Sequence, residues 1–221
     1  PPASVITSAV VLENRPASGP VGTAFRILGS KKEEEQSVLI PPDLAVCDDC
    51  TAEMRDPSNR RYRYPFINCT NCGPRYTIIR DLPYDRPKTA MAPFAMCPSC
   101  SREYHDSSDR RFHAQPNACF ECGPSVWLAD SGGTVLCRGD EAVGKCSALL
   151  DEGRIIAVKG IGGFHIACTP FSDEVVARLR QRKGRKDKPF AVMASSIEEA
   201  ERMAHIPASA RELMLSPRKP I

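Results

Sequence analysis

Eight of the eleven cysteines lie in four Cys-x-x-Cys pairs, and this spacing directs two thiolates at one point, as tetrahedral zinc sites require. Two pairs separated by eighteen residues form a motif, and the same motif begins again fifty residues later. The sequence therefore predicts two tetrathiolate zinc sites, one in residues 47–72 and one in residues 97–122. The expected ligands are Cys47, Cys50, Cys69, Cys72, Cys97, Cys100, Cys119 and Cys122.

Several alternatives to this assignment stay open at this level. A crossed arrangement would combine cysteines of the two copies, and His105 or His113 could each replace a cysteine. Redox chemistry suits a single Cys-x-x-Cys pair better than four pairs in duplicate, and disulfide-rich domains rarely space all their cysteines in this way. We favour structural zinc, and we expect the three cysteines without metal spacing to be small buried hydrophobes: Cys137, Cys146 and Cys168.

A second group of candidate residues is basic. Arg178 to Lys188 contains seven basic residues and one acid. These charges could simply complement the dipole at the end of a helix. Alternatively, Lys183 and Arg185 flank Gly184 and could form a phosphate site.

The glycine-rich stretch 159–165 follows a predicted strand. Its glycines would let a backbone approach a ligand, and Lys159 could meet an anion. The spacing fits neither the dinucleotide fingerprint nor the P-loop, so a tight strand-to-loop turn is the simpler interpretation. His165 alone is more typical of a structural histidine than of a base.

Composition limits the other functions. The formal charge of +3 becomes −1 once eight thiolates remove eight charges and two zinc ions return four, so no global basic character favours nucleic acid. Metal binding would supply on the order of 10 kcal/mol of folding free energy per site. Each tetrathiolate site carries a charge of about −2. We expect nearby arginines to neutralise it or to donate hydrogen bonds, namely Arg60, Arg61, Arg63, Arg110 and Arg111.

The elements expected around these residues change character near residue 126. Residues 1–30 predict two short strands at 5–12 and 24–28, and a charged linker follows, whereas short helices are expected after Cys50 and Cys100. The later part alternates strands with helices, which predicts an α/β domain with at least a partly parallel sheet. We expect a hairpin of 126–129 with 134–138, then a helix that Asp140 caps and Gly153 ends, with an apolar stripe of Val143, Cys146, Leu149 and Leu150. A buried strand at 154–159 and a helix that Ser172 caps and Gly184 ends should follow. The last expected elements are a strand at 190–193, a helix that begins with the capping box of Ser196 and Glu199, and a helix at 208–215.

No apolar signal peptide or 18-residue apolar run is visible, so nothing indicates export or a membrane span, and we expect a cytoplasmic protein. The start at Pro1 without a methionine suggests a fragment.

The repeated motif resembles the zinc-finger region of the hydrogenase-maturation carbamoyltransferases, the HypF family. Both copies read C-x2-C-x18-C-x2-C, with twenty-four residues between them. The segments next to the cysteine pairs, at 42–47, 63–77 and 112–119, also resemble that region of the family. The stretches 156–165 and 182–193 resemble the first part of the YrdC-like domain of that family, and residues 1–30 resemble the tail of its acylphosphatase-like domain.

The resemblance implies a multidomain protein with α+β and α/β parts. Its divisions would be the acylphosphatase-like tail in 1–30, a linker in 31–42, two small four-cysteine zinc-finger modules in 43–125, and an incomplete YrdC-like α/β domain in 126–221. Proteins of this family use carbamoyl phosphate and ATP, with Mg²⁺, to make carbamoyl adenylate. They pass the carbamoyl group to the C-terminal cysteine of a partner maturation protein, for the cyanide ligand of [NiFe] hydrogenase.

By the same resemblance, nucleotide or substrate binding falls to Lys159, Lys183, Arg185 and Lys188, and no catalytic residue is assigned. We expect the chain alone to be inactive, because the rest of the adenylation site and the transfer domain would lie elsewhere. Two other functions remain as alternatives: a zinc-stabilised module for protein interaction in 43–125, and RNA binding through 178–188.

Overall fold

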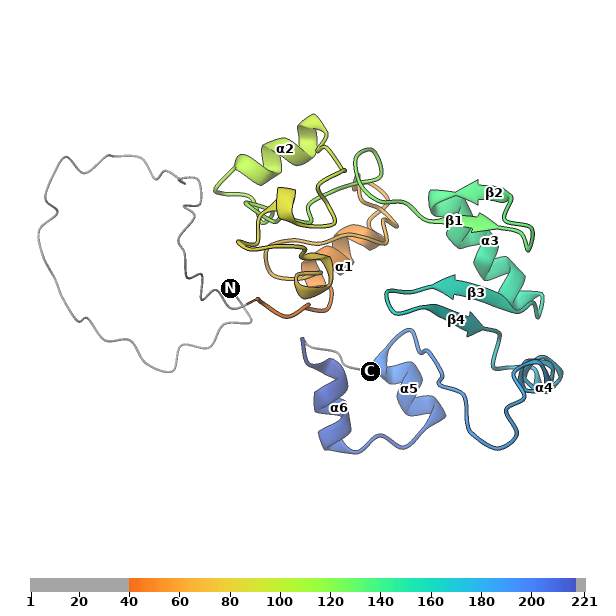
Figure 1. The fold of residues 1–221 in the computed structure, drawn as a ribbon. Coiled ribbons are helices and arrows are strands. Elements are labelled where there is room, and N and C mark those ends of the chain that lie inside the picture. Colours follow the sequence, from red (N-terminus) through yellow and green to blue (C-terminus); the bar gives the residue numbers. More distant parts are fainter. Residues whose placement is uncertain (1–39, 218–221) are drawn as a thin grey trace, which may run out of the picture.

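The structure is a computed structural model that describes residues 40–217 (Figure 1). The strands expected at 5–12 and 24–28, the tail at 1–30 and most of the linker at 31–42 lie outside the described residues. Two regions follow one another along the described chain, and we call residues 43–125 the metal region and residues 126–217 the C-terminal region. None of the described helices is both long enough and apolar enough to cross a membrane.

The metal region contains little regular structure. Its α-helices are α1, Asp48–Arg55, and α2, Pro98–His105, and two 3-10 turns lie between them at Tyr76–Ile78 and Arg86–Lys88. Both α-helices begin directly after the first cysteine of their motif, earlier than the expected start after the second. Acidic residues in the first turn of α1 and a proline at the start of α2 explain this, because both favour a helix N-terminus.

The interior of the metal region combines both copies of the motif. Tyr64 of the first copy is fully buried, donates its hydroxyl to the carbonyl of Pro124 at 3.2 Å, and packs edge-on against Phe120, with ring centroids 4.8 Å apart. Gly73 adopts φ +93°, and a Cβ there would lie 2.7 Å from the Cβ of Asn68. The glycine that follows the last cysteine of the first copy is therefore required by space and by backbone conformation.

The C-terminal region opens with the expected hairpin. Strands β1, Trp127–Ala129, and β2, Val135–Arg138, pair antiparallel, and the Asp130 carboxylate accepts hydrogen bonds from the amides of Gly132 and Thr134 at 2.8 and 2.9 Å. The turn between β1 and β2 therefore forms as predicted, because an aspartate side chain can hydrogen-bond the backbone amides that follow it.

Helix α3, Gly139–Asp151, packs against this hairpin. It ends as expected, with Gly153 at φ +73°. The prediction for its start was wrong, because Arg138 occupies the N-cap position and Asp140 pairs with Arg63 of the metal region at 2.5 Å. The predicted apolar stripe is also only partly right, since Val143 is exposed and Ala142 is the buried residue.

Strands β3, Ile156–Lys159, and β4, Phe164–Ala167, form a second antiparallel hairpin. The predicted parallel pairing is absent from residues 40–217, where each sheet has two antiparallel strands. The expected burial of the first strand is wrong too, since Val158 is 47% exposed. A parallel neighbour needs a crossover back to the same sheet, whereas the short loop at 160–163 lets β3 pair with the segment that follows it.

The remaining elements are helices. They are α4, Asp173–Arg182, α5, Ile197–Met203, and α6, Ala208–Leu215. Ser172 and Ser196 cap α4 and α5 through their hydroxyl oxygens, as the sequence predicts. The strand expected at 190–193 does not form, and Met193 is 97% exposed, because the apolar side chains of this stretch have no neighbouring strand to pair with among the described residues. Beyond α6 the chain returns to the metal region, where the Ala45 amide donates to the Pro217 carbonyl at 2.8 Å (Figure 1).

Candidate functional site

The eight paired cysteines form two separate clusters, each made from one copy of the motif. Cys47, Cys50, Cys69 and Cys72 lie together, and so do Cys97, Cys100, Cys119 and Cys122, with the sulfur atoms of each cluster within 4.8 Å of one another. The first two cysteines of each cluster stand at the start of a short helix, α1 or α2, and the last two stand in a tight turn. The crossed arrangement left open by the sequence is therefore not the one observed.

The sulfur geometry fits zinc. Neighbouring Sγ atoms are 3.6–3.8 Å apart in the first cluster and 3.5–3.8 Å apart in the second. A regular tetrahedron with zinc–sulfur bonds of about 2.3 Å has sulfur–sulfur edges of about 3.8 Å. Disulfide bonds would need sulfur atoms about 2.05 Å apart, and all eleven cysteines are free thiols. Both clusters thus have the donor set and the spacing of a closed metal site with four cysteine ligands.

Histidines take no part in either cluster. The ring of His113 lies beside the ring of Tyr104, with centroids 4.8 Å apart. The Nδ1 atom of His105 lies 2.8 Å from the carbonyl oxygen of Ser101, within hydrogen-bond distance. The alternative in which a histidine replaces a cysteine is therefore not the one observed.

Arginines approach the clusters from the opposite copy of the motif. Arg60 donates to the Cys100 sulfur at 3.3 Å, and Arg110 donates to the Cys50 sulfur at 3.0 Å. The predicted arginine contacts therefore exist, but spacing alone had not indicated that they cross between the copies. Arg63 does not join them, because it pairs with Asp140.

Two glutamates that were not among the predicted site residues anchor these arginines. Glu53 pairs with Arg110 and Arg111, and Glu103 pairs with Arg60 and Arg61. Burial by itself would raise the pKa of Glu103, but hydrogen bonds from its two arginines outweigh burial and hold this pKa at about 2. The signal was present in the sequence, since each glutamate lies three residues after a cysteine on a predicted helix.

Burial and hydrogen bonding shift the pKa values of individual cluster thiols in opposite directions. Burial raises the pKa of Cys100 to about 12, although the guanidinium of Arg60 opposes the shift. In the first cluster, hydrogen bonds from Cys50 and Cys72 lower the pKa of Cys69. Four buried thiolates need a cation to form together, and a divalent metal supplies it.

Two further buried arginines support the turns around the clusters. Arg75 donates to the carbonyls of Cys69 and Cys72 at 3.1 and 3.0 Å, and so fixes the turn that carries these two sulfurs. Arg86 donates to the carbonyls of Gln115 and Asn117 at 2.6 and 2.9 Å. Burial lowers the pKa of Arg86. Nothing in their spacing distinguishes these two from exposed arginines.

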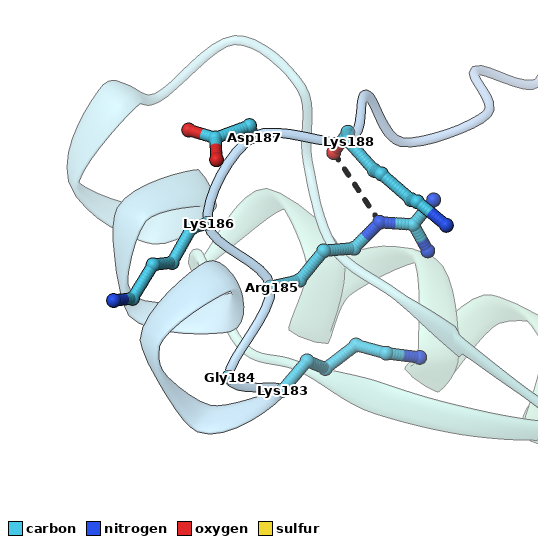
Figure 2. Close-up of a pocket in the computed structure, with 6 residues that line it drawn as sticks. All are labelled: Lys183, Gly184, Arg185, Lys186, Asp187 and Lys188. Carbon is cyan, nitrogen blue, oxygen red and sulfur yellow. Dashed lines mark hydrogen bonds between the residues drawn. The ribbon is translucent and has the colours of Figure 1, made fainter.

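The basic stretch forms a loop after α4. A pocket there is lined by residues 183–188 (Figure 2). The side chains of Lys183, Arg185 and Lys188 extend to the same side of the loop, whereas Lys186 extends to the other side (Figure 2). Three cations on one face favour an anionic ligand.

Arg180, which was not among the predicted site residues, holds this loop in shape. It lies on α4, and its guanidinium donates to the carbonyls of Arg185, Lys186 and Lys188 at 3.3, 3.2 and 3.0 Å. It also lies over the ring of Phe190, 4.8 Å from the centroid. Arg180 therefore ties the loop to α4.

Lys159 is not part of this pocket. It ends β3, and its ammonium lies 5.0 Å from the ring centroid of Phe164 on the paired strand. The three unpaired cysteines are half-buried rather than fully buried: Cys137, Cys146 and Cys168.

Two closed four-cysteine clusters on a duplicated module, followed by a segment of mixed helices and strands, define a zinc-finger protein with a second, α/β-type part. The family profile described as "HypF finger" matches residues 46–79 and 96–129. The profile of the Sua5/YciO/YrdC family, described as "Telomere recombination", matches residues 148–219.

Individual relatives agree with these matches. The chain is 56% identical over 198 residues to a probable carbamoyltransferase HypF of Methanocaldococcus jannaschii, which covers 89% of this chain and 26% of that protein. It is 50% identical over 210 residues to carbamoyltransferase HypF2 of Cupriavidus necator, with coverages of 95% and 26%. The chain therefore belongs to the HypF family of carbamoyltransferases, and it spans about a quarter of the length of these relatives.

Solved structures give the same result. A crystal structure of HypF from T. kodakarensis is 51% identical and superposes with a TM-score of 0.78, covering 85% of this chain and 24% of that chain. A full-length HypF in a phosphate- and nucleotide-bound form is 52% identical, with a TM-score of 0.71 and coverages of 81% and 23%.

Proposed function

We propose that this chain is part of an enzyme that converts carbamoyl phosphate and ATP to carbamoyl adenylate. The carbamoyl group then passes to the C-terminal cysteine of a partner maturation protein, for the cyanide ligand of [NiFe] hydrogenase. The similarity to HypF carbamoyltransferases over 89–95% of the chain supports this assignment. The chain spans about a quarter of the length of these relatives, so the activity is proposed for the full-length enzyme.

Within this enzyme, the metal region binds two zinc ions through the eight clustered cysteines. The matching sulfur–sulfur distances support this role. In both clusters four thiolates fill a tetrahedral shell, so no coordination position is left for a substrate, as is typical of structural zinc. The metal thus stabilises the fold of residues 43–125.

That closed coordination also favours the second candidate function for this region. A zinc-stabilised module without an open metal position is suited to docking other domains or partner proteins. Loss of partner binding after Cys119→Ser, with adenylation retained in the full-length enzyme, would support this function. Unchanged partner binding in this variant would rule out the docking function.

The basic loop binds the phosphates of ATP in our proposal, with Mg²⁺ shared between the phosphates. The single observation that carries this assignment is the common direction of Lys183, Arg185 and Lys188 (Figure 2). Adenylation develops negative charge on phosphate oxygens, and cations fixed in advance stabilise it without reorganisation. Arg185 is fixed in this way, because it donates to the carbonyls of Lys188 and Pro189 at 3.2 and 3.0 Å. Lys159 lies outside the loop pocket, and its role as a further cation for the substrate stays a prediction.

The test is pyrophosphate release from ATP by the full-length enzyme, measured as a function of carbamoyl phosphate. We expect Lys183→Ala and Arg185→Ala each to reduce kcat/KM by about 100-fold, the scale of losing one preorganised charge contact in a transition state. Lys186→Ala is the matched control, because this lysine belongs to the same loop but points away from the other three. Full activity in the first two variants would refute the site assignment.

RNA binding through residues 178–188 is an alternative that the same protein can test. A steep loss of RNA affinity with increasing salt would favour it, whereas no binding at moderate salt would exclude it.

A further inference from the structure

Each cysteine cluster accepts hydrogen bonds from arginines of the other module, and we call these reciprocal contacts the arginine exchange. Arg60 and Arg61 belong to the first module, residues 47–72, but their guanidinium groups donate to the Cys100 sulfur of the second module at 3.3 and 3.5 Å. Arg110 belongs to the second module, residues 97–122, and donates to the Cys50 sulfur of the first at 3.0 Å. Cys50 and Cys100 are equivalent positions of the repeat, so the exchange is reciprocal.

Each exchange is fixed by a carboxylate on the receiving module. Glu103 accepts from Arg60 at 2.6 Å and from Arg61 at 2.5 Å, and Glu53 accepts from Arg110 and Arg111 in the same way. Because each glutamate lies one helical turn after the contacted cysteine, the carboxylate and the sulfur face the same incoming guanidinium. The glutamate thus aims the positive charge at the metal cluster.

Burial makes the exchange obligatory for both modules. Arg61 is 2% exposed and Arg111 is 4% exposed. Besides Glu103 and Cys100, the side chain of Arg61 bonds the Asn117 side chain and the Ala118 carbonyl, both at 2.9 Å and both in the second module. A guanidinium buried without partners is strongly unfavourable, so the first module cannot bury Arg61 without the second.

The same holds in the reverse direction. Arg111 donates to the Asn68 carbonyl at 3.0 Å and to Glu53, both in the first module. The Thr70 amide and the Arg110 carbonyl, 3.1 Å apart, add a backbone bond across the two modules. The arginines of one module are therefore part of the environment of the other module's metal cluster.

We infer that the two metal centres are coupled, because each module supplies the positively charged residues that stabilise the thiolates of the other. This inference rests on the proposal that both clusters bind zinc. Filling one site orders its module, including the arginines that it extends, and so raises the affinity of the other site. Coupling of this kind is reciprocal, so each site raises the affinity of the other by the same factor. Arg60 and Arg110 are positioning residues for a metal centre outside their own module.

The first experiment measures the metal affinity of each site in the full-length protein. Cadmium NMR distinguishes the two centres through cadmium–cysteine couplings, and competition with a chromophoric chelator gives the affinities. We expect Arg60→Gln to weaken the second site by about 10-fold to 100-fold, the range for residues that support metal ligands. Arg110→Gln should weaken the first site similarly. Arg60→Lys should restore part of the loss, since it retains the charge but not both donated bonds.

Arg102→Gln is the matched control. Arg102 lies on α2 of the second module, and its side chain donates to the Ser99 hydroxyl at 3.2 Å rather than to a cysteine or a glutamate, so its replacement should leave both affinities unchanged. The inference fails if Arg60→Gln leaves the second site unchanged, or weakens only the site of its own module.

The second experiment removes one site and observes the other. Cys69→Ser disables the first site without touching an arginine that crosses between the modules. It should weaken the second site by about 5-fold to 150-fold, the usual size of coupling between sites, and Arg60→Gln should then add little. If this variant does not fold, the arginine variants still decide the question, because they retain all eight cysteines. A wild-type protein that binds no zinc would refute the proposed function, whereas two independent sites would refute only the coupling.

Discussion

The metal region and the C-terminal region differ in what fills their interiors. All of the buried polar and charged residues among positions 40–217 lie in the metal region, together with the buried cysteines and a few apolar side chains. The C-terminal region holds all the described strands of both hairpins and four of the α-helices, yet its only buried residues up to position 217 are Ala142, Val175 and Leu179.

This difference shows that regular secondary structure and a closed interior are separable. The metal region closes around thiolates, guanidinium groups and carboxylates whose geometry is fixed by coordination and hydrogen bonding. The C-terminal region forms its helices and hairpins from local signals, but these elements bury little apolar surface against one another.

Chelation of zinc should affect the two regions very differently. Removing the metal costs on the order of 10 kcal/mol of folding free energy per site, so the metal region should lose its structure. The hydrogen bonds of α3 and α4 should persist, because Ser172 caps α4 and Gly153 ends α3, and both residues belong to the C-terminal region. Amide hydrogen exchange of the two regions before and after chelation measures this. Retained protection in residues 47–122 would show that apolar packing, rather than metal, holds the region.

The buried arginine network is the next largest contribution. Arg61→Met should destabilise the zinc-loaded protein by about 3 kcal/mol, because it removes one partner of a buried ion pair. Glu103 keeps Arg60, which limits the loss. Urea unfolding of the zinc-loaded chain measures the change. The exposed Arg102 gives the control, and Arg102→Met should change stability by less than about 0.5 kcal/mol. Equal effects would mean that the crossing contacts contribute little.

Backbone effects dominate in the C-terminal region. Gly153→Ala should destabilise it by about 1–2 kcal/mol, because φ is +73° there and the new Cβ would lie 3.0 Å from Val175. Gly144→Ala, in the interior of α3 with open space around it, should instead stabilise the region by about 1 kcal/mol. Thermal unfolding followed by circular dichroism resolves the opposite signs. The same sign for both would contradict the described end of α3.

The smallest effect concerns the basic loop. Arg180→Gln removes the bonds to three loop carbonyls, at a cost of about 1 kcal/mol for such exposed bonds. Amide exchange in residues 183–188 should then be about fivefold faster. Arg182→Gln is the control on the same helix turn. If both variants exchange alike, Arg180 does not hold the loop.

Much of the local structure was predictable. The helix caps at Ser172 and Ser196, the Asp130 turn and the helix ends at Gly153 and Gly184 all depend on residues within a few positions, and they form as expected. The cysteine spacing likewise identified both clusters. The strand predicted at 190–193 does not form, because an apolar run becomes a strand only where another strand offers hydrogen bonds.

The partner of each arginine was not predictable for a different reason. Both copies of the repeat carry the same Glu and Arg-Arg pattern, so Arg60 could have met Glu53 of its own module as well as Glu103 of the other. Spacing along the chain cannot separate these two pairings. Only the placement of one module against the other decides between them.

The cysteines of each metal cluster, the local caps and the turns follow from the amino-acid sequence, because they depend on short spacings and on the preferences of single residues. The contacts that Arg60, Arg61, Arg110 and Arg111 make with the other module, and the contact of Arg180 with the basic loop, arise only when the chain packs. The physical reason is that a buried guanidinium must satisfy several donors at once, and the acceptors that do so come together only when distant segments pack.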